Sequence, residues 1–183
     1  MSKIKVIEQD IIFLSYDEPN ADTNYQHLLT LCPGALRVHG VKGSDTAHKA
    51  VAQISQSQNV IIVDADNFVK PEFFSQTYEI GNIDLASSVL SFTANNKING
   101  QQYGNGGIKV WPVELLKSMQ THENSVESST LVDFDLSNYK QINYVASEIH
   151  YSSPKQAWRA GFREGVKLLL DDGQYKRDIH NID

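Results

Sequence analysis

The sequence predicts a single α/β domain, in which helices flank a mostly parallel sheet. Short apolar runs at 11–14, 35–39 and 60–63 are bounded by polar loops, which is typical of strands buried on both faces. Helical patterns over 24–31 and 45–55 alternate with these runs, as expected for successive β/α units. With 183 residues, the chain is long enough to enclose one hydrophobic core.

Later parts of the chain continue this alternation less regularly. We expect strands at 4–7, 84–92 and 108–111, a strand or turn at 131–135, and helices after Pro71 and over 112–119 and 155–170. Residues 95–107 are rich in Asn, Gln and Gly and predict a loop. In the last helix Trp158 and Phe162 share an apolar stripe, so we expect Trp158 in the core rather than on a stacking platform. Residues 171–183 predict an exposed tail.

Composition and charge exclude several classes of protein. The net charge of −6 argues against a general nucleic-acid binder, which would normally be basic. The single cysteine, Cys32, excludes an internal disulfide and a metal site built from cysteines. Since no signal peptide and no apolar run near the length of a membrane span is present, we expect a cytoplasmic protein.

The segment that carries the most chemical information is Asn59–Asn67, in which an apolar run ends in Asp64-Ala65-Asp66. Side chains two residues apart in a strand point to the same side, so the two carboxylates are expected to converge. Two like charges held together favour a cation between them, and a divalent metal that also binds a polyphosphate is the simplest choice. The alternative is an acidic turn after a core strand, in which Asp66 or Asn67 caps a helix ahead of Pro71.

The order of three segments resembles the GT-A class of nucleotide-sugar glycosyltransferases, especially family 2. These segments are Phe13–Glu18, Gly43–Ala50 and the Asp64–Asn67 motif followed by Pro71. The likeness covers residues 11–75 well and 103–119 less well. A further segment, His150–Trp158, is similar to the metal- and diphosphate-binding segment of family 8, but it lacks the glycine and places Lys155 one position early.

The resemblance implies a UDP-sugar donor, Mn²⁺ or Mg²⁺ as cofactor, and an unknown glycan, lipid or protein acceptor. Carboxylates suit such hard cations, and Mn²⁺ also accepts imidazole, so the expected metal ligands are Asp66 and His150. The residues expected at the donor are Ser15, Tyr16, Asp17, Lys42, Asp45, Asp64, Ala65, Asn105, Gly106 and Lys155. Arg159 and Arg163 are further candidates for neutralising phosphate. If the reaction inverts configuration, Asp133 and Asp135 are the candidates for the base.

Other interpretations stay open at this point. His150 also fits a hydrogen-bonded structural histidine, and Lys155 fits a solvated residue in a first helical turn. Haloacid-dehalogenase phosphatases also place a D-x-D after a strand, but usually near the N-terminus, whereas here two β/α units precede it. Sugar nucleotidyltransferases open with a Gly- and Arg-rich loop, which residues 15–22 lack. A non-catalytic nucleotide-sugar-binding module is the third alternative, because this chain has little or none of the acceptor-binding part that is found in the GT-A class.

Overall fold

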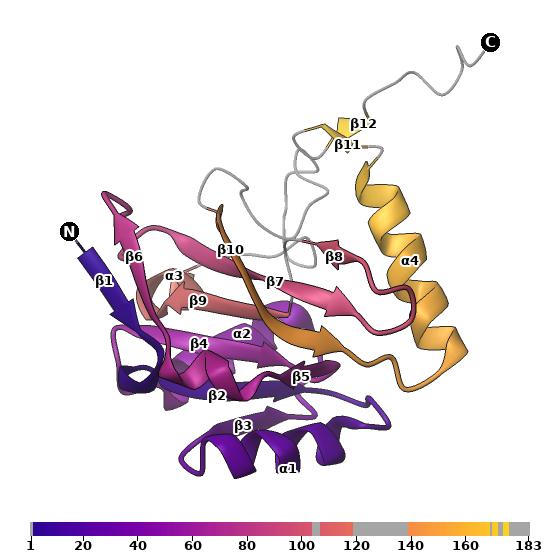
Figure 1. The fold of residues 1–183 in the computed structure, drawn as a ribbon, viewed down its shortest axis with the longest axis horizontal. Coiled ribbons are helices and arrows are strands. Elements are labelled where there is room, and N and C mark those ends of the chain that lie inside the picture. The colour runs from indigo at the N-terminus through magenta and orange to yellow at the C-terminus, as the bar shows by residue number, and fades with distance from the viewer. Residues whose placement is uncertain (1, 104–106, 119–138, 169, 172–173, 176–183) are drawn as a thin grey trace.

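One sheet of eight strands organises the computed structural model, which describes residues 2–103, 107–118, 139–168, 170–171 and 174–175. Its strand order is β3-β2-β4-β9-β7-β10-β5, and β8 pairs with β7 (Figure 1). The strands are β2 (Asp10–Ser15), β3 (Leu36–His39), β4 (Asn59–Asp64), β5 (Asn67–Val69), β7 (Val89–Asn96), β8 (Gln102–Tyr103), β9 (Ile108–Pro112) and β10 (Tyr139–Ile149).

Strand directions decide where a ligand can bind. Strands β2, β3, β4, β7 and β10 run one way, whereas β5, β8 and β9 run the other way. The carboxyl ends of β2, β3 and β4 therefore meet at one edge of the sheet, where open α/β folds bind their ligands. The predicted α/β sheet is confirmed, and its mixed character comes from three strands whose direction the sequence does not mark.

Helices cover both faces of the sheet, because β2 and β4 are apolar on both sides. Helix α1 (Ala21–Leu31) places Leu28 in one core cluster, which also contains Phe13 from β2. On the other face, α2 (Ser44–Ile54) and α3 (Val113–Ser118) supply Val51 and Leu116 to a second cluster around the buried Trp111. Burial of these side chains is the main favourable term in folding.

Smaller elements complete the described structure. Strand β1 (Ser2–Lys5) pairs with β6 (Thr77–Gly81), and two 3₁₀ turns, η1 (Val6–Glu8) and η2 (Pro71–Ser75), lie near this pair in the chain. Helix α4 (Pro154–Leu168) lies beside the sheet, and the short β11 (Leu170–Asp171) and β12 (Gln174–Tyr175) follow it (Figure 1). Within the described ranges, no helix is long and apolar enough to cross a membrane.

Several boundaries differ from the sequence prediction. The helix expected after Pro71 is only the 3₁₀ turn η2, and the strand expected at 84–92 begins at Val89. Part of the expected tail forms the β11–β12 pair. The expectation that Trp158 lies in the core is wrong, because its surface is 67% exposed. The strand or turn expected at 131–135 lies outside the described residues.

Candidate functional site

A cavity of about 870 Å³ opens at the edge of the sheet where β2 and β4 end. Its walls come from these two strand ends, from the start of α2 and from one side of α4. The structure brings seven of the predicted site residues together in its lining, namely Ser15, Tyr16, Asp17, Lys42, Asp64, Ala65 and Asp66. The space is within the size range of ligand sites in proteins.

The backbone around the two aspartates is fixed by contacts from distant parts of the chain. Asn24, buried in α1, donates its side-chain amide to the Ala65 carbonyl at 2.8 Å. The backbone N–H of His150 donates to the Asp66 carbonyl at 2.7 Å, at the end of the β5–β10 pairing. Asn20 in turn donates to the His150 carbonyl at 2.8 Å. The loop between β4 and β5 is therefore held from both sides.

The carboxylate of Asp66 is oriented by a buried polar relay. The Asn67 side-chain amide donates to Oδ1 of Asp66 at 2.7 Å, and its own Oδ1 accepts a hydrogen bond from the Ser147 hydroxyl at 2.6 Å. Both Asn67 and Ser147 are buried. Because buried polar groups are costly when unpaired, this relay favours one orientation of Asp66 over others.

Gly107 permits the close approach of β9 to the D-x-D segment. Its carbonyl accepts the Asp64 N–H at 2.7 Å. A Cβ atom at Gly107 would overlap the Asn67 side-chain amide and would lie 2.8 Å from Cβ of Asp64. Only glycine fits this position without moving the aspartate segment.

The charges around Asp66 are unfavourable in the absence of a cation. Burial raises the pKa of Asp66, and the neighbouring Asp64 raises it further, to about 6. Arg163 and the hydrogen bond from Asn67 act in the opposite direction, and Glu18 adds a smaller upward shift. A positive charge between the two aspartates would relieve this repulsion.

The two aspartates fit a hard divalent cation whose remaining ligands come from water and a substrate. Their oxygens are the donors that Mg²⁺ and Mn²⁺ prefer, and such ions commonly use one or two carboxylates together with phosphates. Within the described part of the chain, no group of three or more His, Cys, Asp or Glu residues could hold a metal. A complete cage of protein ligands is therefore not formed by these residues.

His150 is not among the residues that line the cavity. Its ring stacks on Phe68 at a centroid distance of 5.0 Å, and its Nε2 lies 3.2 Å from Oε2 of Glu148. On its other side Phe68 stacks on His27 at 3.5 Å. His150 is thus next to Asp66 through its backbone, and its ligation of a metal remains a prediction.

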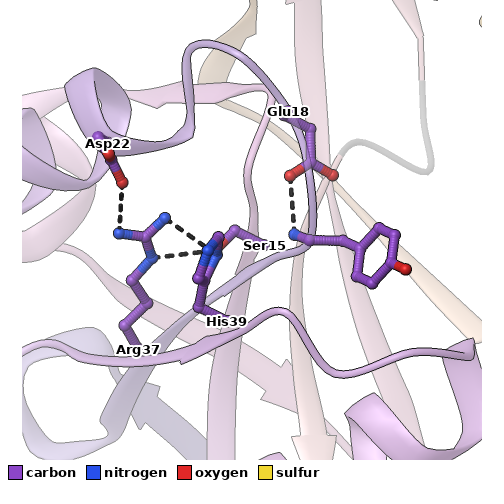
Figure 2. Close-up of polar contacts among 6 residues, drawn as sticks. Ser15, Glu18, Asp22, Arg37 and His39 are labelled. Carbon is purple, nitrogen blue, oxygen red and sulfur yellow. Dashed lines mark hydrogen bonds and ion pairs between the residues drawn. The ribbon is translucent and has the colours of Figure 1, made fainter.

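The hydrogen bonds around Ser15 determine which of the neighbouring atoms donate and which accept (Figure 2). Arg37 donates through Nε to the Ser15 hydroxyl at 2.9 Å, and a second guanidinium nitrogen lies 3.2 Å from Nδ1 of His39. A guanidinium only donates, so Nδ1 must be an acceptor, and neutral His39 carries its proton on Nε2. Ser15 therefore donates to this Nδ1, at 2.9 Å, and can accept only one further hydrogen bond.

Arg37 is itself oriented from several directions. It pairs with Asp22 at 2.7 Å, and its guanidinium carbon lies 5.2 Å from the ring centroid of Tyr25. At the mouth of the cavity, the Tyr16 N–H donates to Glu18 at 2.8 Å, which turns the chain directly after β2 (Figure 2). These contacts shape the loop that forms one wall of the cavity.

Two predicted donor residues lie outside the lining, although they are near it in sequence. Asp45 is buried and forms an ion pair with Lys49 at 2.9 Å, one turn further along α2. Lys155 is exposed at the start of α4. The remaining predicted residues, Asn105, Gly106, Asp133 and Asp135, lie outside the described part of the chain.

Helix α4 contributes a wall that sequence reasoning only partly anticipated. Trp158, Arg159, Phe162 and Arg163 line the cavity. The sequence marks the two arginines as candidates for phosphate, whereas the helical period places Trp158 in the core. The amphipathic pattern was real, but periodicity alone does not tell whether an apolar stripe faces a core or a ligand.

No protein-family model and no curated protein matches the chain. Among solved structures it is similar to a glycosyltransferase involved in the glycosylation of the major capsid of PBCV-1, at 14% identity and a TM-score of 0.48. It is also similar to HddC from Yersinia pseudotuberculosis complexed with GMP-PN, at 10% identity and a TM-score of 0.49. Both alignments cover 85% of this chain and 99% of the other. At these identities and TM-scores, the likenesses assign no activity to this chain.

Proposed function

We propose that this chain is a metal-dependent glycosyltransferase that transfers a sugar from a UDP-sugar to an acceptor hydroxyl. The observation that carries the proposal is the pair Asp64 and Asp66, which line a cavity at the carboxyl edge of the sheet, where Asp64 adds to the burial that raises the pKa of Asp66. A Mn²⁺ or Mg²⁺ ion and a diphosphate would complete such a site. UDP is expected from the resemblance of the sequence to GT-A enzymes.

The residues of the cavity suit the charges of a nucleotide diphosphate sugar. Asp66, oriented by Asn67, would hold the cation from the sheet side. Arg163 is close enough to Asp66 to lower its pKa, so it would face the same diphosphate from α4. Tyr16 lies 46% exposed at the rim, where its ring would stack on the base.

In the proposed reaction the oxygen of the acceptor hydroxyl bonds to the anomeric carbon, and the bond from this carbon to the diphosphate oxygen breaks. The electron pair of that bond leaves with the nucleoside diphosphate, and the hydroxyl proton passes to a base. A bound divalent cation would stabilise the negative charge that develops on the leaving diphosphate. Arg163 would add to this stabilisation by hydrogen bonding to phosphate oxygens. Asp133 and Asp135 remain the predicted bases if the configuration inverts.

A screen of nucleotide sugars with Mn²⁺ tests the proposal through the group that is released. Slow hydrolysis of a UDP-sugar to UDP and free sugar, abolished by Asp66→Asn, is the expected result. Release of pyrophosphate from UTP and a sugar phosphate would instead indicate nucleotidyl transfer. If UDP binds in the presence of Mn²⁺ but no donor turns over with any acceptor, the chain is a binding module and the proposed transfer is wrong.

A further inference from the structure

The side of α4 that lines the cavity displays two aromatic rings with little protein over them. Trp158 and Phe162 are 67% and 61% exposed, and their rings stack with centroids 5.4 Å apart and planes inclined by 15°. Large exposed apolar groups that adjoin one another are unusual unless they bind something. Because both rings line the same cavity as Asp66, a ligand in this cavity would contact them.

A column of basic residues runs along the helix beside the aromatic pair. Arg159 and Arg163 follow Trp158 and Phe162 by one position each, so the two columns run along the helix axis about 100° apart around it, and both line the cavity. Residues four apart on a helix are separated by about 6 Å along the axis. Aromatic side chains and arginines that recur at this interval would suit a polymer of sugar rings that carries negative charge.

The charge of α4 differs from that of the rest of the protein. Its sequence holds four basic residues and one acidic residue, whereas the whole chain has 16 basic and 22 acidic residues. An anionic polymer is repelled by most of this surface, so α4 is where it would be attracted. A neutral glycan would use the aromatic rings alone and would leave the positive charge of Arg159 unused, because Arg163 is the arginine that faces Asp66 and the diphosphate.

We propose that the aromatic and basic wall formed by Trp158, Arg159 and Phe162 binds the acceptor, and that this acceptor is an anionic glycan. Sugar rings would stack on Trp158 and Phe162, while carboxylate, sulfate or phosphate groups would pair with Arg159, and Arg163 would face the donor diphosphate. The end of such a glycan would then reach the same cavity as Asp66. The inference rests on the proposed glycosyltransferase function and specifies its acceptor class.

The two tryptophans of the chain allow a direct test by fluorescence. Trp111 is 2% exposed and Trp158 is 67% exposed, so iodide quenching reports chiefly on Trp158. The probes are tetrasaccharides of galacturonate, of sulfated heparin and of a sugar phosphate, with maltotetraose as the neutral counterpart. Each is titrated with UDP and Mn²⁺ present, and calorimetry in the same buffer reports whether UDP itself binds.

We expect at least one anionic tetrasaccharide to protect Trp158 from iodide, and maltotetraose to give no protection. Phe162→Ala should weaken this binding at least about tenfold, and Arg159→Gln about fivefold or more. The effect of Arg159→Gln should shrink at high salt, because charge pairing is screened. The matched controls are Ile98→Ala, which removes another exposed apolar side chain, and Lys117→Gln, which removes a charge from α3; both should bind like the wild type.

Several results would overturn the inference. Equal binding of maltotetraose would remove the anionic requirement, and protection by UDP with Mn²⁺ alone would assign the wall to the donor. If only vesicles of phosphatidylglycerol protect Trp158 from iodide, the wall is a membrane contact. If none of the oligosaccharides protects Trp158, the wall does not bind the acceptor. Failure of UDP to bind, read separately by calorimetry, would instead refute the proposed function.

Discussion

Replacing Asp66 by Asn is predicted to stabilise the metal-free protein while it destroys the site. The pKa of Asp66 is raised from 3.8 to about 6, so its charged form is unfavourable in the folded state by about 3 kcal/mol at neutral pH. Asn carries no charge and its Oδ1 can still accept from Asn67. For a chain of this length, such a gain corresponds to an increase in Tm of about 6–12 °C.

The pH dependence of this gain follows from the sign of the shift. An acid whose pKa is raised on folding binds more protons in the folded state, so the wild type loses stability as pH rises from about 4 to about 6. The difference between Asp66→Asn and wild type should therefore vanish below about pH 4 and be largest above about pH 6. Chemical denaturation of both proteins across this range, without divalent cations, measures it.

Asp84, whose pKa is shifted in the opposite direction, provides the control. Asp84 accepts hydrogen bonds from the Ala86 N–H and the Ser87 hydroxyl, which hold its pKa below the usual value. Asp84→Asn should therefore not stabilise the protein at neutral pH. Adding Mn²⁺ should raise the Tm of the wild type, by binding the folded state, and should not raise that of Asp66→Asn. A wild type as stable as Asp66→Asn above about pH 6 without metal would refute the electrostatic reasoning.

Three other substitutions test how the site is built. Gly107→Ala should lower stability by about 2 kcal/mol or more, because its Cβ has no room, whereas Gly34→Ala, which meets nothing within 4 Å, should change Tm little. Arg37→Met should cost about 1–2 kcal/mol and weaken UDP binding, since Ser15 loses its donor; unchanged stability and UDP affinity would contradict the role given to Arg37. His150→Gln should change Mn²⁺ affinity less than about twofold without UDP, and about tenfold or more with it, because the ring must leave its stack to reach a metal. A tenfold loss without UDP would contradict the observed position of the ring.

Short sequence patterns predicted those strands and turns that are determined by a few neighbouring residues. The short apolar run before Asp64 indicated a buried strand, and the pair of acids after it indicated the edge of the sheet where the cavity lies. The Gly43 turn also marked the start of α2, because a residue with φ of 89° favours glycine. These features need only a few neighbouring residues to be recognised.

Contacts between distant residues could not be predicted in the same way. Asn67 and Ser147 are 80 positions apart, and nothing in either segment announces their hydrogen bond. Strand β5 forms only because β10 pairs with it, so a three-residue run gave no signal of its own. The expectation for Trp158 was wrong because the apolar side of a helix does not by itself reveal whether protein covers it.

The proposed function requires that Asp64 and Asp66 hold a cation to which a nucleotide diphosphate binds. Calorimetric titration of the protein with UDP, with and without Mn²⁺, tests it most directly when Asp66→Asn is measured alongside. We predict binding that requires Mn²⁺ and is lost in the variant, although the variant is the more stable protein. UDP binding of equal strength without Mn²⁺, or no binding under either condition, would contradict the claim.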